Sequence, residues 1–166
     1  RPPCRRTWAP KGETPVLVHA FNWKKMSVAA ALAFRLDGRR SRLFFQTTPD
    51  SYNTVRLIAF LKDLHRKMRG KKCILIWDGL AGHKSRAMMA YLAGQRSWLR
   101  VERLPGYAPD LNPVEPLWGN IKGQELANRC AVDIGEADRA LRQGMARVRS
   151  RNDLAFAFLH HAGLFF

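Results

Sequence analysis

Two carboxylates of this 166-residue chain stand in places where their chemistry could be used. Asp78 follows directly after the apolar run CILIW, Cys73–Trp77, which predicts a central strand buried on both faces. Glu115 lies between Pro113 and Pro116, in a loop that turns into a helix. In open α/β sheets, functional groups gather beyond the carboxyl ends of strands. The strand therefore makes Asp78 a candidate for site chemistry, and the two prolines predict a rigid mount for Glu115.

Each carboxylate also has a purely structural explanation. Asp78 and Gly79 form a turn dipeptide, and an aspartate in this position can also cap the following helix. Asn112 and Glu115 have capping-box spacing, so Glu115 could serve the helix N-terminus and its dipole. Pro116 counts against the capping box, because a proline one step further in clashes with the carbonyl of the capping residue.

The helix after Glu115 carries two candidates for contact with nucleic acid. Trp118 and Lys122 follow Glu115 at i+3 and i+7, on the same helical face. A carboxylate with a cation one or two turns away suits a metal ion and a phosphate side by side. Trp118 and Tyr107 could stack on a base or sugar, although core packing is the more common place for a helical tryptophan.

Two further candidates follow Asp78. His83, five residues later, would lie at the mouth of the crevice and position a phosphate or a ligand carboxylate, or else cap the next helix. Its neighbour Lys84 is a candidate for nucleic-acid contact. Asp110 is better explained as an Asx-turn residue that shapes its loop than as a metal ligand.

The elements that must position these residues alternate between strands and helices. The predicted strands cover Val16–Ala20, Met26–Phe34, Arg42–Gln46, Cys73–Trp77 and Leu99–Leu104, with a hairpin turn at Asp37-Gly38. The predicted helices run from Tyr52 to a stop at Gly70, over Ser85–Arg96, from near Pro113, and over Asp133–Ser150. This order predicts an α/β sheet with helices on both faces.

The charge of the chain points to a polyanionic partner. Lys and Arg number 29 against 13 Asp and Glu, which gives a formal net charge of +16, and the sequence pI is about 10.9. Such an excess is typical of proteins that bind nucleic acid. Cations crowd three stretches: Arg35–Arg42, Lys62–Lys72 and Arg139–Arg151. Some of these clusters should follow phosphates, with salt-sensitive binding, and the others should be solvated.

Other classes of protein are disfavoured. No run of about 18 apolar residues is present, so the sequence predicts no membrane span. Cys4, Cys73 and Cys130 are odd in number and far apart, which predicts neither a disulfide framework nor a zinc knuckle and fits a reducing cytosol.

The sequence blocks that hold the two carboxylates resemble a known family. ILIWDGLAGHKS, residues 74–85, and YAPDLNPVEPLWGNIKG, residues 107–123, are similar to the second and third catalytic blocks of DDE transposases of the IS630/Tc1/mariner superfamily. The spacing of 36 residues between Asp78 and Glu115 is close to that of the superfamily. TWAPKGETPVL, residues 7–17, is similar to the segment that follows the first catalytic aspartate in IS630-like members.

This resemblance implies a fold and a domain organisation. The fold is ribonuclease-H-like, with a mixed central sheet covered by helices on both faces and its first strand missing. Residues 1–166 form a single catalytic domain, without the helix-turn-helix region that reads transposon ends. Asp37 and Asp50 do not match the first catalytic aspartate, which belongs before the TWAP segment. We therefore expect Asp78 and Glu115 to be the second and third carboxylates of an incomplete triad.

The resemblance also implies a chemistry. Three carboxylates hold two Mg²⁺ ions, for which Mn²⁺ can substitute, and activate a water and then a DNA 3′-hydroxyl for attack on a phosphodiester. Asp78 and Glu115 are then metal ligands, and the partners are transposon ends and target DNA. The resemblance also implies a location on the nucleoid and allows a homodimer of the full-length protein. Gly79 replaces the asparagine that usually follows the second aspartate. This chain alone should have little or no strand-transfer activity.

Two other functions fit the same residues. The first is a DNA-binding remnant of a transposase in which cleavage is lost. The second is a ribonuclease-H-like junction resolvase, which cuts branched DNA without joining ends, although the PDLNPVEPLW block counts against it.

Overall fold

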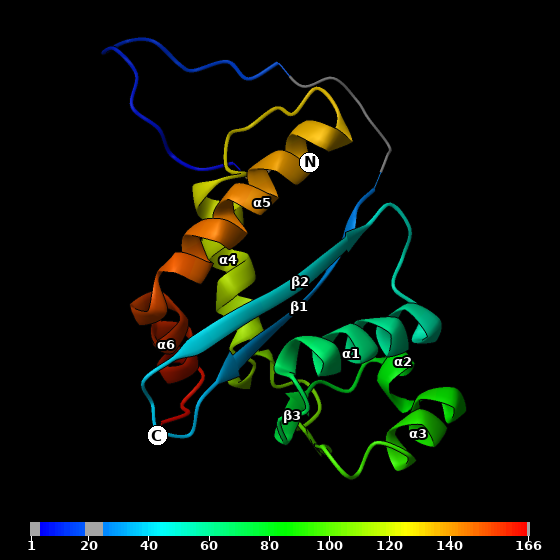
Figure 1. Ribbon diagram of the computed structural model, residues 1–166. Helices are drawn as coiled ribbons and strands as arrows, with labels where there is room; N and C mark the ends of the chain where they lie inside the picture. Colours follow the sequence, from blue (N-terminus) through cyan, green and yellow to red (C-terminus); the bar gives the residue numbers. More distant parts are fainter. Residues whose placement is uncertain (1–3, 19–24, 166) are drawn as a thin grey trace.

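The computed structural model describes residues 4–18 and 25–165 of the chain. Its helices and strands follow one another in the predicted α/β order (Figure 1). The strands are β1 (Ser27–Phe34), β2 (Ser41–Thr48), β3 (Cys73–Trp77) and β4 (Leu99–Arg103). The helices are α1 (Thr54–Met68), α2 (Ala81–Lys84), α3 (Arg86–Ala93), α4 (Val114–Gln124), α5 (Ile134–Ser150) and α6 (Asn152–His161), with a 3₁₀ turn, η1 (Pro109–Leu111), before α4.

The predicted hairpin is confirmed. β1 and β2 pair antiparallel along their whole length, from Ser27 opposite Thr48 to Phe34 opposite Ser41. Gly38 takes a φ of 66°, which glycine adopts without strain. The prediction of a strand at Val16–Ala20 is wrong for its described part, since residues 16–18 are exposed coil with no partner strand. Residues 19–20 lie outside the described residues.

The second pair of strands is parallel. Cys73 of β3 lies opposite Leu99 of β4, and Trp77 lies opposite Arg103. The expectation that β3 is buried on both faces is wrong, because Ile74 and Ile76 are 60% and 47% exposed. Only the alternate face of β3, which includes the buried Trp77, packs against helices.

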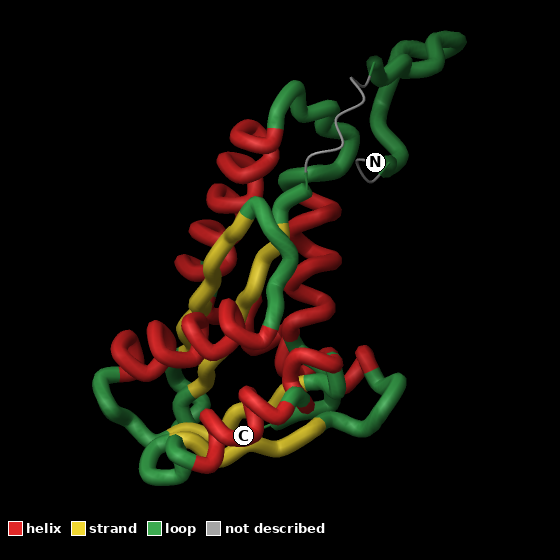
Figure 2. Tube along the Cα trace, turned by 90° about the vertical axis from the view of Figure 1, so that its right-hand side faces the viewer, coloured by secondary structure: helices red, strands yellow, loops and turns green. Residues whose placement is uncertain are grey.

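The four strands form two separate pairs in place of one continuous sheet. The strands are drawn in yellow in Figure 2. Strands of both directions are present, as predicted for a mixed sheet. Helix α1 joins the pairs, because Phe60, Leu61 and Leu64 lie in one apolar cluster with alanines of β1 and with Leu75 of β3. One helix thus packs against both pairs of strands.

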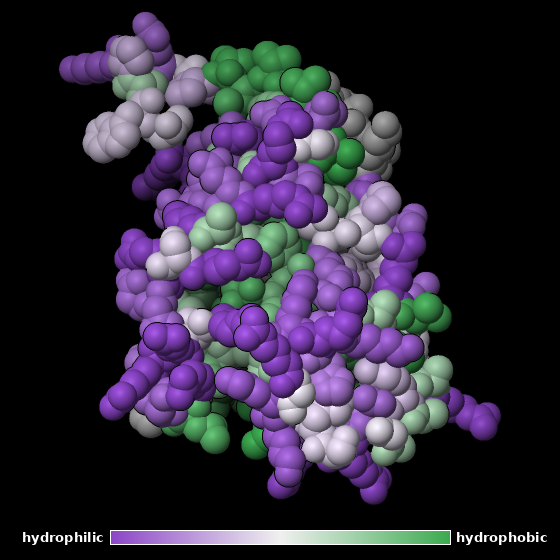
Figure 3. All heavy atoms as spheres, in the orientation of Figure 1, coloured by the Kyte–Doolittle hydropathy of each residue, from purple (hydrophilic) through white to green (hydrophobic). Residues whose placement is uncertain are grey.

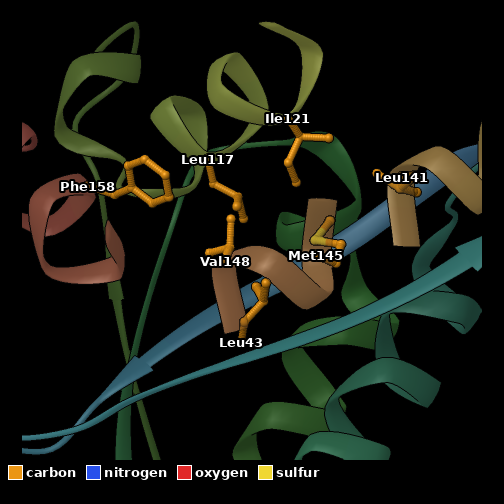
Figure 4. Close-up of a cluster of buried hydrophobic side chains, with 7 residues drawn as sticks. All are labelled: Leu43, Leu117, Ile121, Leu141, Met145, Val148 and Phe158. Carbon is orange, nitrogen blue, oxygen red and sulfur yellow. The ribbon is translucent and has the colours of Figure 1, made fainter. Parts of the chain in front are cut away.

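A second apolar cluster covers the other face of the β1–β2 hairpin. Leu43 of β2 meets Leu117 and Ile121 of α4, and α5 and α6 complete the cluster with Met145 and Phe158 among others (Figure 4). Leu117 and Met145 are fully buried. The hairpin therefore has helices on both faces, as predicted.

A charged contact fixes α4 against α5. The guanidinium of Arg147 donates to both carboxylate oxygens of Glu125, at 2.6 and 3.0 Å, and to the amide oxygen of Asn120, at 2.7 Å. Hydrogen bonding to Glu125 raises the pKa of Arg147 above its ordinary value. A bidentate pair of this kind is directional, so it sets the rotation of α4, the helix that carries Glu115.

We predict that Gly144→Ala destabilises the protein by weakening this contact. A Cβ at Gly144 would stand 2.7 Å from Oε2 of Glu125, closer than the two atoms can lie. We expect a loss of about 1–3 kcal/mol in the free energy of unfolding, measured by urea denaturation. Gly119→Ala in α4 is the matched control, because no atom other than the neighbouring backbone of its own helix lies within 4 Å of its Cβ position. The control should gain about 0.5–1 kcal/mol from helix propensity, and equal effects at both positions would contradict the prediction.

Candidate active site

Asp78 emerges from the carboxyl end of β3, in the predicted position. Its Oδ1 accepts a hydrogen bond from the backbone N–H of Leu80 at 3.2 Å, so the predicted turn role is present. The side chain is 41% exposed, and Oδ2 has no hydrogen-bond partner among the described residues. One oxygen of Asp78 therefore shapes the turn, while the other stays open to solvent.

His83 packs behind Asp78. Its ring is buried and lies parallel to the indole of Trp77, with centroids 4.0 Å apart. Nδ1 lies 2.9 Å from Oδ1 and 3.1 Å from the backbone oxygen of Asp78, which suits an Nδ1–H that donates to both. This geometry favours a role in orienting the Asp78 carboxylate over direct contact with a phosphate.

Lys84 folds over the turn that follows Asp78. Its Nζ lies 3.0 Å from the point where a Cβ on Gly79 would be, so the glycine leaves room for the ammonium group. Lys84 is exposed and makes no ion pair among the described residues. The Lys84 ammonium group therefore lies at the turn that follows Asp78.

Glu115 is the second residue of α4, and the capping box is not formed. The backbone N–H of Asn112, which the Glu115 carboxylate would have to reach, donates instead to the carbonyl of Pro109 at 2.9 Å. The N-cap residue of α4 is Pro113, and the side chain of Asn112 just before it accepts from the N–H of Val114 at 3.2 Å, as in an Asx turn. Pro116, the third residue of α4, falls in the first turn, where no backbone N–H is needed.

The Glu115 carboxylate is exposed and unpaired among the described residues, in a chain with more than two cations for every carboxylate. Eight of the other carboxylates form ion pairs with Lys or Arg, including Asp50, Asp63 and Glu136. Hydrophilic side chains cover much of the face drawn in Figure 3. The absence of a cation at Glu115 leaves both of its oxygens available to a ligand.

The two downstream candidates on α4 have different environments. Trp118 is half-buried and packs against the cluster formed by α4, α5 and α6, so core packing accounts for it. Lys122 is exposed in the last turn of α4.

One backbone bond links the two halves of the candidate site. The N–H of Leu104, the first residue after β4, donates to the carbonyl of Trp77, which immediately precedes Asp78. The loop that ends at Glu115 therefore starts beside Asp78, at the same end of the β3–β4 pair. That the two carboxylates converge on one metal site stays a prediction.

A depression elsewhere on the surface is unrelated to these residues. It has a volume of about 480 Å³ and lies between α1 and α3, lined by His65, Tyr91 and Gln95 among others. Gln95 precedes β4, so this depression lies toward the opposite end of the β3–β4 pair from Asp78.

Comparison with known proteins identifies the fold and the family. A family model described as DDE superfamily endonuclease matches residues 1–136. No curated protein sequence gives a significant match. None of the helices among the described residues has the length and apolar character needed to cross a membrane.

Solved structures of Mos1, a mariner transposase, are similar to this chain. Its paired end complex with Mn matches with a TM-score of 0.66 at 16% identity, over 98% of this chain and 48% of the Mos1 chain. Its strand transfer complex matches with a TM-score of 0.56 at 17% identity, over 98% and 51%. The chain thus spans about half the length of these Mos1 chains, and the ribonuclease-H-like fold predicted from the sequence is confirmed.

We predict that Asp78 and His83 are energetically coupled. His83→Phe keeps a ring against Trp77 but removes the Nδ1 bond, and Asp78→Ala removes its acceptor. A double-mutant cycle in urea should give a coupling of about 0.5–3 kcal/mol. The same cycle with Asp110→Ala, which has no contact with His83 among the described residues, gives the baseline. A coupling no larger than this baseline would show that His83 does not hold Asp78.

Proposed function

This chain belongs to the DDE superfamily endonucleases, and we propose that it is the catalytic domain of a transposase that cleaves DNA and transfers strands at transposon ends. The observation that carries the proposal is the Glu115 carboxylate, exposed and unpaired on a proline-bounded helix start. Its loop begins at the backbone bond beside Asp78. Both oxygens of this carboxylate are available to a metal ion, and its place in a loop that starts beside Asp78 supports a role as a metal ligand.

The donor chemistry of the two carboxylates fits Mg²⁺, which prefers carboxylate oxygens and keeps several waters. Oδ2 of Asp78 and both oxygens of Glu115 are free of partners among the described residues. Residues 4–18 and 25–165 contain no group of three or more His, Cys, Asp or Glu that could hold a metal ion. The proposal therefore requires a further carboxylate, on a strand that precedes Arg1 in the full-length protein.

The sheet offers support for such a strand. β1 pairs only with β2, and β3 pairs only with β4, so each of the four strands has one edge without a partner among the described strands. α1 lies under both pairs. A further strand could pair with one of these open edges and contribute a carboxylate to the site.

Each residue of the site then has a task. Asp78 and Glu115 hold the metal ions, His83 keeps the Asp78 carboxylate in one orientation, and Lys84 binds a phosphate oxygen of the DNA. When bound, the ions stabilise the attacking and leaving oxygens of an in-line displacement. Lys122 contacts the DNA backbone further along α4.

The partners follow from the charge and from the structural relatives. The Mos1 structures include a paired end complex with Mn, a strand transfer complex and a structure of its catalytic domain with Mn. We propose transposon ends and target DNA as partners, Mg²⁺ or Mn²⁺ as cofactor, and a homodimer of the full-length protein on the nucleoid. The +16 charge supplies salt-sensitive affinity for the DNA backbone.

The lack of a three-ligand group favours one alternative, a DNA-binding remnant without cleavage activity. In that case the fold and basic surface persist, and DNA affinity does not depend on Asp78 or Glu115 beyond the change in charge. The same experiment separates the two functions.

We predict Mn²⁺-dependent cleavage of supercoiled plasmid by the chain extended upstream to include the missing strand, and little or none by residues 1–166. Glu115→Gln should abolish cleavage by the extended chain, because it removes a metal ligand. Asp110→Asn is the matched control, since it makes the same charge change in the same loop and should cut like its parent.

Two outcomes would contradict the proposal. Cleavage by Glu115→Gln at the parental rate would mean that Glu115 is not a ligand. Failure of the extended chain to cut, with DNA binding intact, would favour the remnant.

A further inference from the structure

Tyr107 has an unusual backbone conformation that the fold does not explain. Three non-glycine residues among those described have a positive φ: Arg69 at 53°, Tyr107 at 58° and Asn128 at 56°. Arg69 ends α1, and its N–H bonds to the carbonyl of Arg66. Asn128 is a residue type that tolerates this region, and its side chain makes two hydrogen bonds to the backbone of Arg5. Tyr107 has neither justification.

The side chain of Tyr107 makes no contact in the described residues that would offset the strain of its backbone. Its relative exposure is 106%, the highest value among the exposed large apolar residues of the described chain. Its hydroxyl has no hydrogen-bond partner among the described residues. Glycine would adopt the same turn without strain, and a tyrosine normally buries much of its ring. Strained backbone that presents an unused side chain points to function.

The ring is mounted beside the candidate active site. Tyr107 lies three residues after Leu104, whose N–H bonds to the carbonyl before Asp78, so the chain cannot carry it beyond about 11 Å from that point. After Tyr107 the chain enters η1, closed by a bond from the N–H of Leu111 to the carbonyl of Ala108, and then the start of α4. Pro105 and Pro109 stiffen both sides of the turn.

We propose that Tyr107 forms a base-binding site, in which its ring stacks on a nucleobase that has left the duplex beside the candidate site of Asp78 and Glu115. This inference rests on the proposed function, which supplies the DNA. Aromatic rings stack on any base, and enzymes that act on nucleic acid commonly bind bases outside the duplex stack. Trp118, the other aromatic candidate, is half-buried in the core and unsuited to this task.

The test uses 2-aminopurine in the single-stranded overhang of a short duplex, bound by residues 1–166 without divalent metal so that no cleavage occurs. Wild type and Tyr107→Phe should quench the probe, and Tyr107→Leu should not. Tyr107→Leu should also bind the overhang duplex roughly 5- to 150-fold more weakly, while its affinity for a blunt duplex is unchanged. Phe165→Leu is the control for an exposed aromatic ring on another element.

A second variant separates binding from folding. Tyr107→Gly relieves the positive φ, so its urea midpoint should rise even though quenching is lost. Unchanged quenching and affinity in Tyr107→Leu, or a lower midpoint in Tyr107→Gly, would overturn the proposal. Glu115→Gln should quench like wild type, so failure of metal-dependent cleavage and failure of base binding are separate results.

Discussion

The candidate site depends on the parallel pairing of β3 with β4. This pairing ends with Trp77 opposite Arg103 and is extended by the bond from the Leu104 N–H to the Trp77 carbonyl. It therefore sets both the point where Asp78 leaves the sheet and the point where the loop to Glu115 begins. Buried residues of α1 pack this end of the molecule against the hairpin. One apolar cluster therefore positions Asp78 and the start of the loop.

The other end of the loop is positioned by a different set of forces. Leu117 and Ile121 bury one side of α4 against α5 and the hairpin, and the Arg147–Glu125 pair limits rotation of the helix. Glu115 at the start of α4 faces solvent as a result. The β3–β4 pair thus presents Asp78, and α4 presents Glu115.

Local patterns in the sequence predicted the hairpin, α1 and α5 from a period with a turn or cap, and predicted the start of α4 from the prolines of its loop. The burial of β3 was wrong, because an apolar run such as CILIW records only the residue types and not how many faces are covered. The split of the strands into two pairs has no local signal. The orientation of His83 toward Asp78 also depends on packing against Trp77, which spacing alone does not contain.

Departures from local rules gather at the carboxyl end of β3 and in the loop from β4 to α4, which starts beside it. Glu115 lacks a cation among the described residues of a basic chain, Tyr107 combines positive φ with full exposure, and Trp77 buries an indole N–H without a partner. The positive φ of Tyr107 and the buried indole N–H of Trp77 each cost free energy, whereas the exposed Glu115 carboxylate is solvated. Elsewhere, the Arg147–Glu125 pair and two apolar clusters obey the rules closely. Stability concentrated away from this end, with strain and unpaired charge left at it, is the distribution expected of a site built to bind something the fold itself does not supply.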